Sequence, residues 1–135
     1  MANDPRDVDE KKLEELQGKV IGDVAGSLGL IMADMGDPVG ASAHILSSLS
    51  DGGTFMLVEP LAGDTLEENM HPLGQIYYSF STMICAPASK AQEVGLALGA
   101  QAGEKRLTEV LNQAGFTRVR RAAETPTNMV LEARA

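Results

Sequence analysis

Residues 34–60 read DMGDPVGASAHILSSLSDGGTFMLVEP, and they decide the fold prediction because a capped helix leads directly into a buried strand. Asp37 is a good N-cap, and Pro38 suits the first helical position, where its missing N–H leaves no hydrogen bond unmade. Apolar residues then recur at helical spacing on one face, at Val39, Ala43, Leu46 and Leu49. We therefore expect a short helix with one side packed on a core.

The strand follows a glycine turn. Asp51-Gly52-Gly53 ends the helix, because these residues tolerate positive φ. Residues 54–58, TFMLV, form a short apolar run of the kind expected for a strand covered on both faces. A helix that leads into such a strand is half of a βαβ unit. The stretch thus predicts an α/β sheet and raises the question of which strand precedes the helix.

Length and composition limit the function classes. At 135 residues the chain is one domain, and its formal net charge of −8 argues against a phosphate-backbone footprint, so we expect no nucleic-acid partner. The polar first residues, MANDPRDVDEKK, are unlike a signal peptide. No apolar run approaches the ~20 residues of a membrane helix. We expect a cytoplasmic protein with no membrane partner.

The N-terminal part predicts a tail and a helix. Residues 1–10 are polar and are expected to be a disordered tail, and residues 11–33 to be an N-terminal, dimerising helix. The apolar stripe of this helix comprises Leu13, Leu16, Val20, Val24, Leu28 and Ile31. Glycines recur every fourth residue on roughly the opposite side, at Gly18, Gly22 and Gly26. They indicate either small surface residues or a close helix–helix contact. Residues 28–32 are alternatively a strand.

The second half predicts a helical insert and a hairpin. Two insert helices are expected, at about 73–84 and 88–101, separated by Pro87. Another helix starts at Gly103 and stops at Gly115, a natural residue just past a helix end. Residues 116–123 and 128–134 alternate or run apolar around a Pro turn, which predicts an antiparallel pair of strands.

From residue 34 onward, the order of elements and the wording resemble the C-terminal half of a class I S-adenosylmethionine-dependent methyltransferase. The segments that carry this likeness are DMGDPVGA (34–41), LSDGGTFMLVEP (49–60), FSTMICAPAS (80–89), LNQAGFTRVRRA (111–122) and NMVLEAR (128–134). The nearest likeness is to an actinobacterial group with an N-terminal winged-helix and dimerisation domain. KLEELQGKVIGDVAGSLG resembles the opening helix of that group.

The resemblance implies a truncated, Rossmann-like sheet of the α/β class, with a C-terminal antiparallel hairpin, a helical insert and a long N-terminal helix. Residues 34–135 are then a methyltransferase-like subdomain. The family's glycine-rich cofactor loop has no counterpart, because neither GxGxxG nor E/DxGxGxG occurs in this chain. The chain passes from the family's first helix into the loop after its fourth strand, near residues 30–35.

The resemblance also implies which residues line a pocket at the carboxyl ends of the strands. Asp34 and Asp37 would lie nearest to S-adenosylmethionine, and Glu59, Tyr77 and Tyr78 beside a substrate. His71, in the loop after the strand, is the candidate general base. The alternatives are ordinary: a solvated loop histidine, tyrosines packed in the core or an interface, and a solvated strand-end glutamate.

Other polar residues are assigned structural roles. Cys85, the only cysteine, lies among apolar neighbours and is expected to be a buried thiol rather than a nucleophile. No metal site is expected, since Glu67-Glu68 alone would bind weakly. His44 is expected on the exposed side of its helix. Arg118, Arg120 and Arg121 are expected to shield an edge strand.

Three function hypotheses follow. The first is a reduced methyltransferase that uses S-adenosylmethionine by pairing two chains. The second is an inactive homologue that oligomerises or binds an apolar small molecule. The third, DNA-contacting regulation, is weakened by the missing winged helix and the negative charge. Because the strand at 54–58 would lack its neighbour, we expect an open apolar edge and a homo-oligomer, most simply a dimer.

Overall fold

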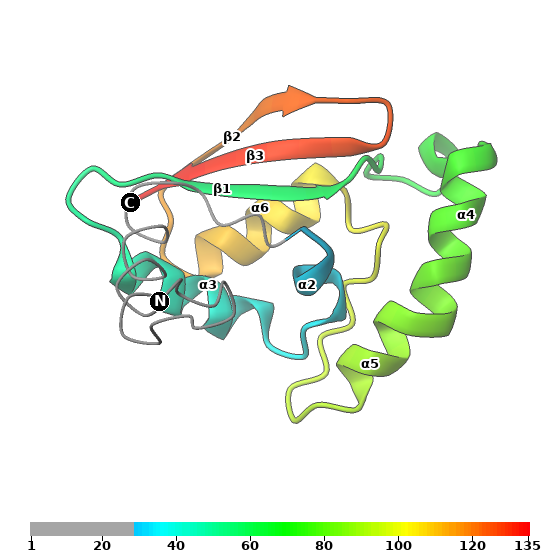
Figure 1. Ribbon diagram of the computed structural model, residues 1–135, viewed down its shortest axis with the longest axis horizontal. Helices are drawn as coiled ribbons and strands as arrows, with labels where there is room; N and C mark the ends of the chain where they lie inside the picture. Colours follow the sequence, from blue (N-terminus) through cyan, green and yellow to red (C-terminus); the bar gives the residue numbers. More distant parts are fainter. Residues whose placement is uncertain (1–28) are drawn as a thin grey trace, which may run out of the picture.

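The computed structural model describes residues 29–135, which fold into a three-stranded sheet with helices against one of its faces (Figure 1). In chain order the elements are α2 (Gly29–Asp34), α3 (Pro38–Ser48), β1 (Phe55–Pro60), the 3₁₀ turn η1 (Glu67–Asn69), α4 (Pro72–Phe80), the π-helical turn η2 (Ser81–Cys85), α5 (Ala86–Lys90), α6 (Gly103–Gln113), β2 (Arg118–Glu124) and β3 (Asn128–Arg134). This mixture of helices and strands agrees with the predicted α/β class. The predicted tail at 1–10 and nearly all of the helix at 11–33 lie outside the described residues.

The sheet has the order β1-β3-β2 and is antiparallel throughout. Strand β3 is central, with Leu131 opposite Leu57 of β1 and Arg121 of β2. The predicted C-terminal hairpin is confirmed. Within residues 29–135 no strand precedes α3, and residues 29–34 are helical instead. The alternative of a strand is therefore wrong for residues 29–32, and residue 28 lies outside the described residues.

Strand β1 is an edge of this sheet in the described part of the chain. The N–H of Leu61 donates to the carbonyl of Thr127 (2.9 Å), so the two-residue period directs the main chain of Met56 and Val58 away from β3. Pro60 ends the strand without an N–H, as suits an edge. The expected cover on both faces is not found among residues 29–135, where Met56 and Val58 remain half-buried.

The core lies between the sheet and the helices below it. Leu107, Val110 and Leu111 of α6 are fully buried in one cluster with the inward residues of the strands. The rings of Phe55 and Phe116 stack with centroids 5.7 Å apart. The expected stop after α6 is confirmed at Gly115, whose φ of 105° requires a glycine. Apolar periodicity thus predicted the α6 contact correctly.

Helix α3 has the predicted cap and the predicted face. The carboxylate of Asp37 accepts a hydrogen bond from the N–H of Gly40 (2.8 Å), and Pro38 begins the helix. The predicted apolar stripe packs against the core cluster, through Val39, Ala43, Leu46 and Leu49. His44 is exposed, on the side away from that stripe.

The insert corrects two predictions. From Pro72 to Lys90 the backbone is helical without a break. Pro87 lies in the first turn of α5, directly after the π-helical turn η2, and this change of hydrogen-bond pattern accommodates its missing N–H. The second predicted helix, at 88–101, is wrong beyond Lys90. Residues Gly95, Ala97 and Gly99 have φ values of 62°, 54° and 69°, so the chain turns repeatedly in the left-handed region and cannot stay helical.

Candidate functional site

The candidate site is a buried corner where the end of α2 meets β1 and η2, and it brings together Asp34, Glu59 and Cys85. Helix α2 contacts β1, η2 and α5. Glu59 is 3% exposed. One carboxyl oxygen of Asp34 (Oδ1) and one of Glu59 (Oε1) are buried without a hydrogen-bond partner in the structure. Buried polar atoms are almost always paired, so two orphaned carboxyl oxygens at one corner are unusual.

Main-chain contacts hold Asp34 in place. The side-chain amide of Gln92 donates to the carbonyl of Asp34 (2.8 Å) and accepts from the N–H of Gly36 (2.8 Å). The buried hydroxyl of Ser89 donates to the carbonyl of Met35 (2.7 Å). Gly36 is required here, because a Cβ at this position would collide with the Gln92 side chain. The loop after α2 is thus fastened to the segment after α5.

Glu59 owes its burial to the period of the strand. Phe55, Leu57 and Glu59 lie on the inner face of β1, so a carboxyl occupies a position that the pattern would give to an apolar side chain. Burial, with a smaller contribution from the charge of Asp34, raises the pKa of Glu59 from its ordinary 4.5 to about 9. At neutral pH Glu59 is therefore protonated and can donate a hydrogen bond.

Cys85 ends the π-helical turn and faces the same corner. Burial raises the pKa of its thiol to about 11, and the neighbouring carboxyl of Asp34 adds to the shift by favouring the protonated form. The thiol is therefore a poor nucleophile at neutral pH. The predicted burial of the thiol is confirmed. Nothing in the sequence indicated that it would lie beside the two carboxyls.

The two candidate tyrosines differ in their contacts. The hydroxyl of Tyr77 donates to the carbonyl of Thr127 (2.7 Å), which ties α4 to the start of β3. Its ring packs against the small cluster of Ala33, Cys85 and Ala100, so it walls the corner from the insert side. Tyr78 is half-buried, and within residues 29–135 its hydroxyl has no hydrogen-bond partner.

His71 lies in a different feature. It caps α4, and its Nδ1 accepts a hydrogen bond from the N–H of Gly74 (3.2 Å), so in the neutral ring Nε2 carries the N–H and is a donor. The side chain lines a surface groove of about 370 Å³ that also includes Asp64, Glu68 and Arg121. The carboxylates of Glu104 and Glu124 pair with Arg121 (each 2.8 Å). Asp34, Glu59 and Cys85 are not among the residues lining this groove.

Of the two side chains that the resemblance would assign to S-adenosylmethionine, one has another task in the structure. The carboxylate of Asp37 is occupied in capping α3. The glycine-rich loop at 91–103 directs its N–H groups at protein atoms: that of Leu96 donates to the carbonyl of Gly36, that of Ala97 to Ser89 Oγ and that of Ala100 to Ser81 Oγ. Residues 29–135 therefore do not offer a fitting cradle for this cofactor.

Sequence reasoning missed Gln101. Both polar atoms of its side-chain amide are buried and lack a partner in the structure. An isolated glutamine between alanines carries no periodic signal, so only the folded chain identifies it. Within the part of the chain that the structure describes, no three His, Cys, Asp or Glu side chains gather to hold a metal ion. None of the helices described there is long and apolar enough to cross a membrane.

Comparisons with protein-family models and with curated proteins give no match to this chain.

Proposed function

We propose that this chain is a reduced homologue of a class I S-adenosylmethionine-dependent methyltransferase, retaining the substrate side of the fold and inactive as a methyltransferase by itself. The observation that carries the proposal is the corner itself, where the charge of Asp34 acts on Glu59 and each carboxyl has one orphaned oxygen. These are two of the residues that the resemblance assigns to the ligand pocket. The resemblance assigns Asp34 to the cofactor side and Glu59 to the substrate side, so the corner would be what remains of the place where the two sides meet.

The corner's chemistry suits recognition of a polar group on a small molecule. Protonated Glu59 donates a hydrogen bond, and the orphaned carboxyl oxygen of Asp34 beside it is an acceptor. A hydroxyl or amine on an otherwise apolar substrate could satisfy both orphaned oxygens. The packed ring of Tyr77 supplies an apolar wall next to them. Methyl transfer from a sulfonium needs alignment more than covalent help, so such contacts would position a substrate rather than activate it.

Calorimetric titration with S-adenosylmethionine tests the proposal. We expect no binding at millimolar ligand, because residues 29–135 lack a fitting cradle and the family's glycine loop is absent from the sequence. Binding in the micromolar range, weakened in Asp34→Asn and unchanged in the surface variant Glu109→Gln, would contradict it and favour an active enzyme. The oligomeric state of the same sample should be measured by sedimentation.

A second function, an oligomerising or apolar-ligand-binding module, is favoured by one observation. Large apolar side chains are exposed along the insert at helical spacing: Ile76 (51%), Phe80 (47%), Met83 (67%) and Ile84 (52%). An exposed apolar stripe of this kind marks a partner or ligand surface. A monodisperse monomer that binds no apolar dye would contradict this alternative.

A further inference from the structure

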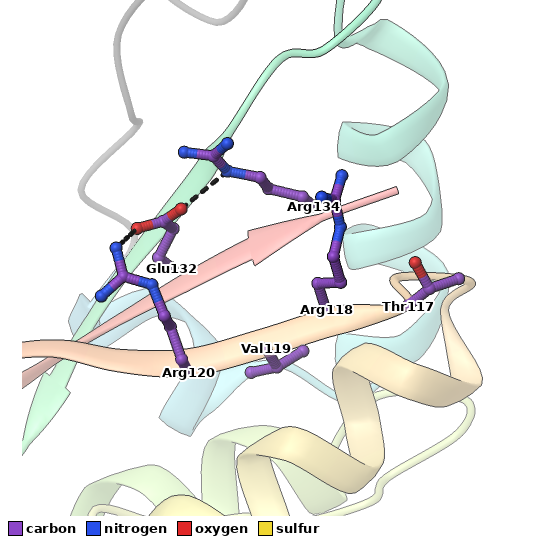
Figure 2. A pocket seen from close by; sticks show the side chains of 6 residues that line it. All are labelled: Thr117, Arg118, Val119, Arg120, Glu132 and Arg134. Atoms are coloured by element: carbon purple, nitrogen blue, oxygen red, sulfur yellow. Dashed lines mark hydrogen bonds and ion pairs between the residues drawn. The ribbon is translucent and has the colours of Figure 1, made fainter.

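A basic groove lies on the outer face of the sheet, remote from the residues of the corner. It has a volume of about 510 Å³ and is lined by Thr117, Arg118, Val119, Arg120, Glu132 and Arg134. Figure 2 shows the three arginines and Glu132 on one side of the β2–β3 pair, with Val119 turned to the other side. Three positive charges thus meet one negative charge, on a chain whose formal net charge is −8.

The single carboxylate is fully occupied. One oxygen of Glu132 pairs with Arg120, and the other accepts from Nε of Arg134 (2.6 Å). Arg118 has no side-chain carboxylate partner among residues 29–135, and its guanidinium donates to the main-chain oxygen of Ala135 (3.3 Å). The groove therefore holds three guanidinium groups and one side-chain carboxylate.

The strand register concentrates that charge. Arg118 lies directly opposite Arg134 on the neighbouring strand, whereas Arg120 lies opposite Glu132. Like charges at directly opposed positions destabilise a sheet, and opposite charges stabilise it. Arg120 thus has an opposite charge directly across the strand pair, whereas Arg118 and Arg134 have a like charge there. An anion between these two guanidinium groups would remove the repulsion.

We propose that this groove binds a compact oxyanion, the phosphate group of a small molecule or inorganic phosphate, through Arg118 and Arg134. Guanidinium groups present paired N–H donors that match phosphate oxygens, and Thr117 adds a hydroxyl donor at the end of the groove. A compact anion fits better than a polyanion, because a nucleic acid would extend beyond the groove over a chain of net negative charge. Arginines that only shielded the β2 edge would not need to line one groove together.

Titration of the whole chain with inorganic phosphate at constant ionic strength, followed by NMR or calorimetry, tests this site. We expect saturable binding that Arg118→Gln weakens about three- to tenfold, because one charge-assisted contact is lost at an exposed site. Arg106→Gln is the matched control, since Arg106 lies on α6 and pairs with Glu109. Non-saturable binding, or equal losses in both variants, would overturn the proposal.

A gain-of-binding variant separates a built site from general attraction. Glu132→Gln releases Arg120 and Arg134, so phosphate should bind several-fold more tightly, whereas Glu109→Gln changes the net charge equally without affecting the groove. Equal gains in both variants would overturn the site.

Acetate and a short oligonucleotide complete the test: weaker binding of each than of phosphate is expected, and tighter binding of either contradicts the phosphate assignment. A phosphorylated sugar that binds more tightly than inorganic phosphate would identify the small-molecule source, and equal binding would identify the free ion.

Discussion

The inner face of the sheet and the corner between α2 and β1 are both buried, but they differ in what they bury. Beneath the sheet, Leu107, Val110, Leu111 and Leu131 are almost inaccessible and entirely apolar. At the corner, by contrast, the polar groups of Glu59, Asp34 and Cys85 are near neighbours. The first arrangement stabilises the fold, while the second opposes folding unless something pairs its polar atoms. The contrast therefore separates the part of the molecule that stabilises the fold from the part proposed to bind a ligand.

The largest expected effect comes from the apolar side of this comparison. Leu131→Ala on the central strand should lower the free energy of unfolding by about 2–5 kcal/mol, since it removes buried methyl groups and leaves a cavity. Chemical denaturation measures the change. Leu66→Ala is the control, because Leu66 is 58% exposed and should change stability little. A small effect at Leu131 would contradict the placement of the core.

The corner should respond in the opposite direction. The folded-state pKa of Glu59, about 9, lies above its ordinary 4.5, so its contribution to stability is fully present below about pH 4.5 and is lost as pH rises through 9. Glu59→Gln keeps the shape and cannot ionise. We therefore expect it to raise the free energy of unfolding by about 1–3 kcal/mol at alkaline pH and to flatten the pH slope.

Denaturation series across this pH range measure both quantities for Glu59→Gln. Glu109→Gln, on the exposed side of α6, should leave the slope unchanged. If the slope survives in Glu59→Gln, another group carries it. Asp34 and Cys85 are the neighbours to examine next, since the charge of Asp34 also raises the pKa of the Cys85 thiol.

A medium effect is expected where the insert is tied to the sheet. Tyr77→Phe removes the hydrogen bond to the Thr127 carbonyl and should lower the free energy of unfolding by about 0.5–1.5 kcal/mol. Tyr78→Phe offers a matched control one residue away, because its hydroxyl has no partner among the described residues. Thermal denaturation of the two variants compares them. Equal losses would show that the tie at Tyr77 does not hold α4.

The parts of the fold that the sequence predicted are those governed by local rules. The Asp37 cap, the α3 stripe, the face of α6 ending at Gly115, and the terminal hairpin each follow from side-chain period or backbone preference within a few residues. The insert was harder, because Pro87 reads as a helix breaker unless its place in the first turn of a helix is known. The left-handed turns after Lys90 include Ala97, which carries no such signal.

The candidate site was predictable as a set of residues but not as a cluster. Asp34 and Glu59 stood out in the sequence through the resemblance, at the start of a loop and at the end of a strand. Their meeting depends on α2 packing against β1, which joins segments far apart in the chain. Cys85 joins the two carboxyls only through that packing. His71 was grouped with the pocket, and the structure places it in a separate groove.

The smallest effect on stability is expected on the exposed stripe of the insert. Met83→Lys replaces a side chain that is 67% exposed, so the free energy of unfolding should change by no more than about 0.5 kcal/mol. Self-association and apolar-dye binding should nevertheless fall, because a charge interrupts the apolar stripe between Phe80 and Ile84. Glu93→Gln, on a neighbouring exposed loop, changes the net charge by the same one unit and is the control. If both variants self-associate to the same extent, the exposed stripe of the insert is not a contact surface.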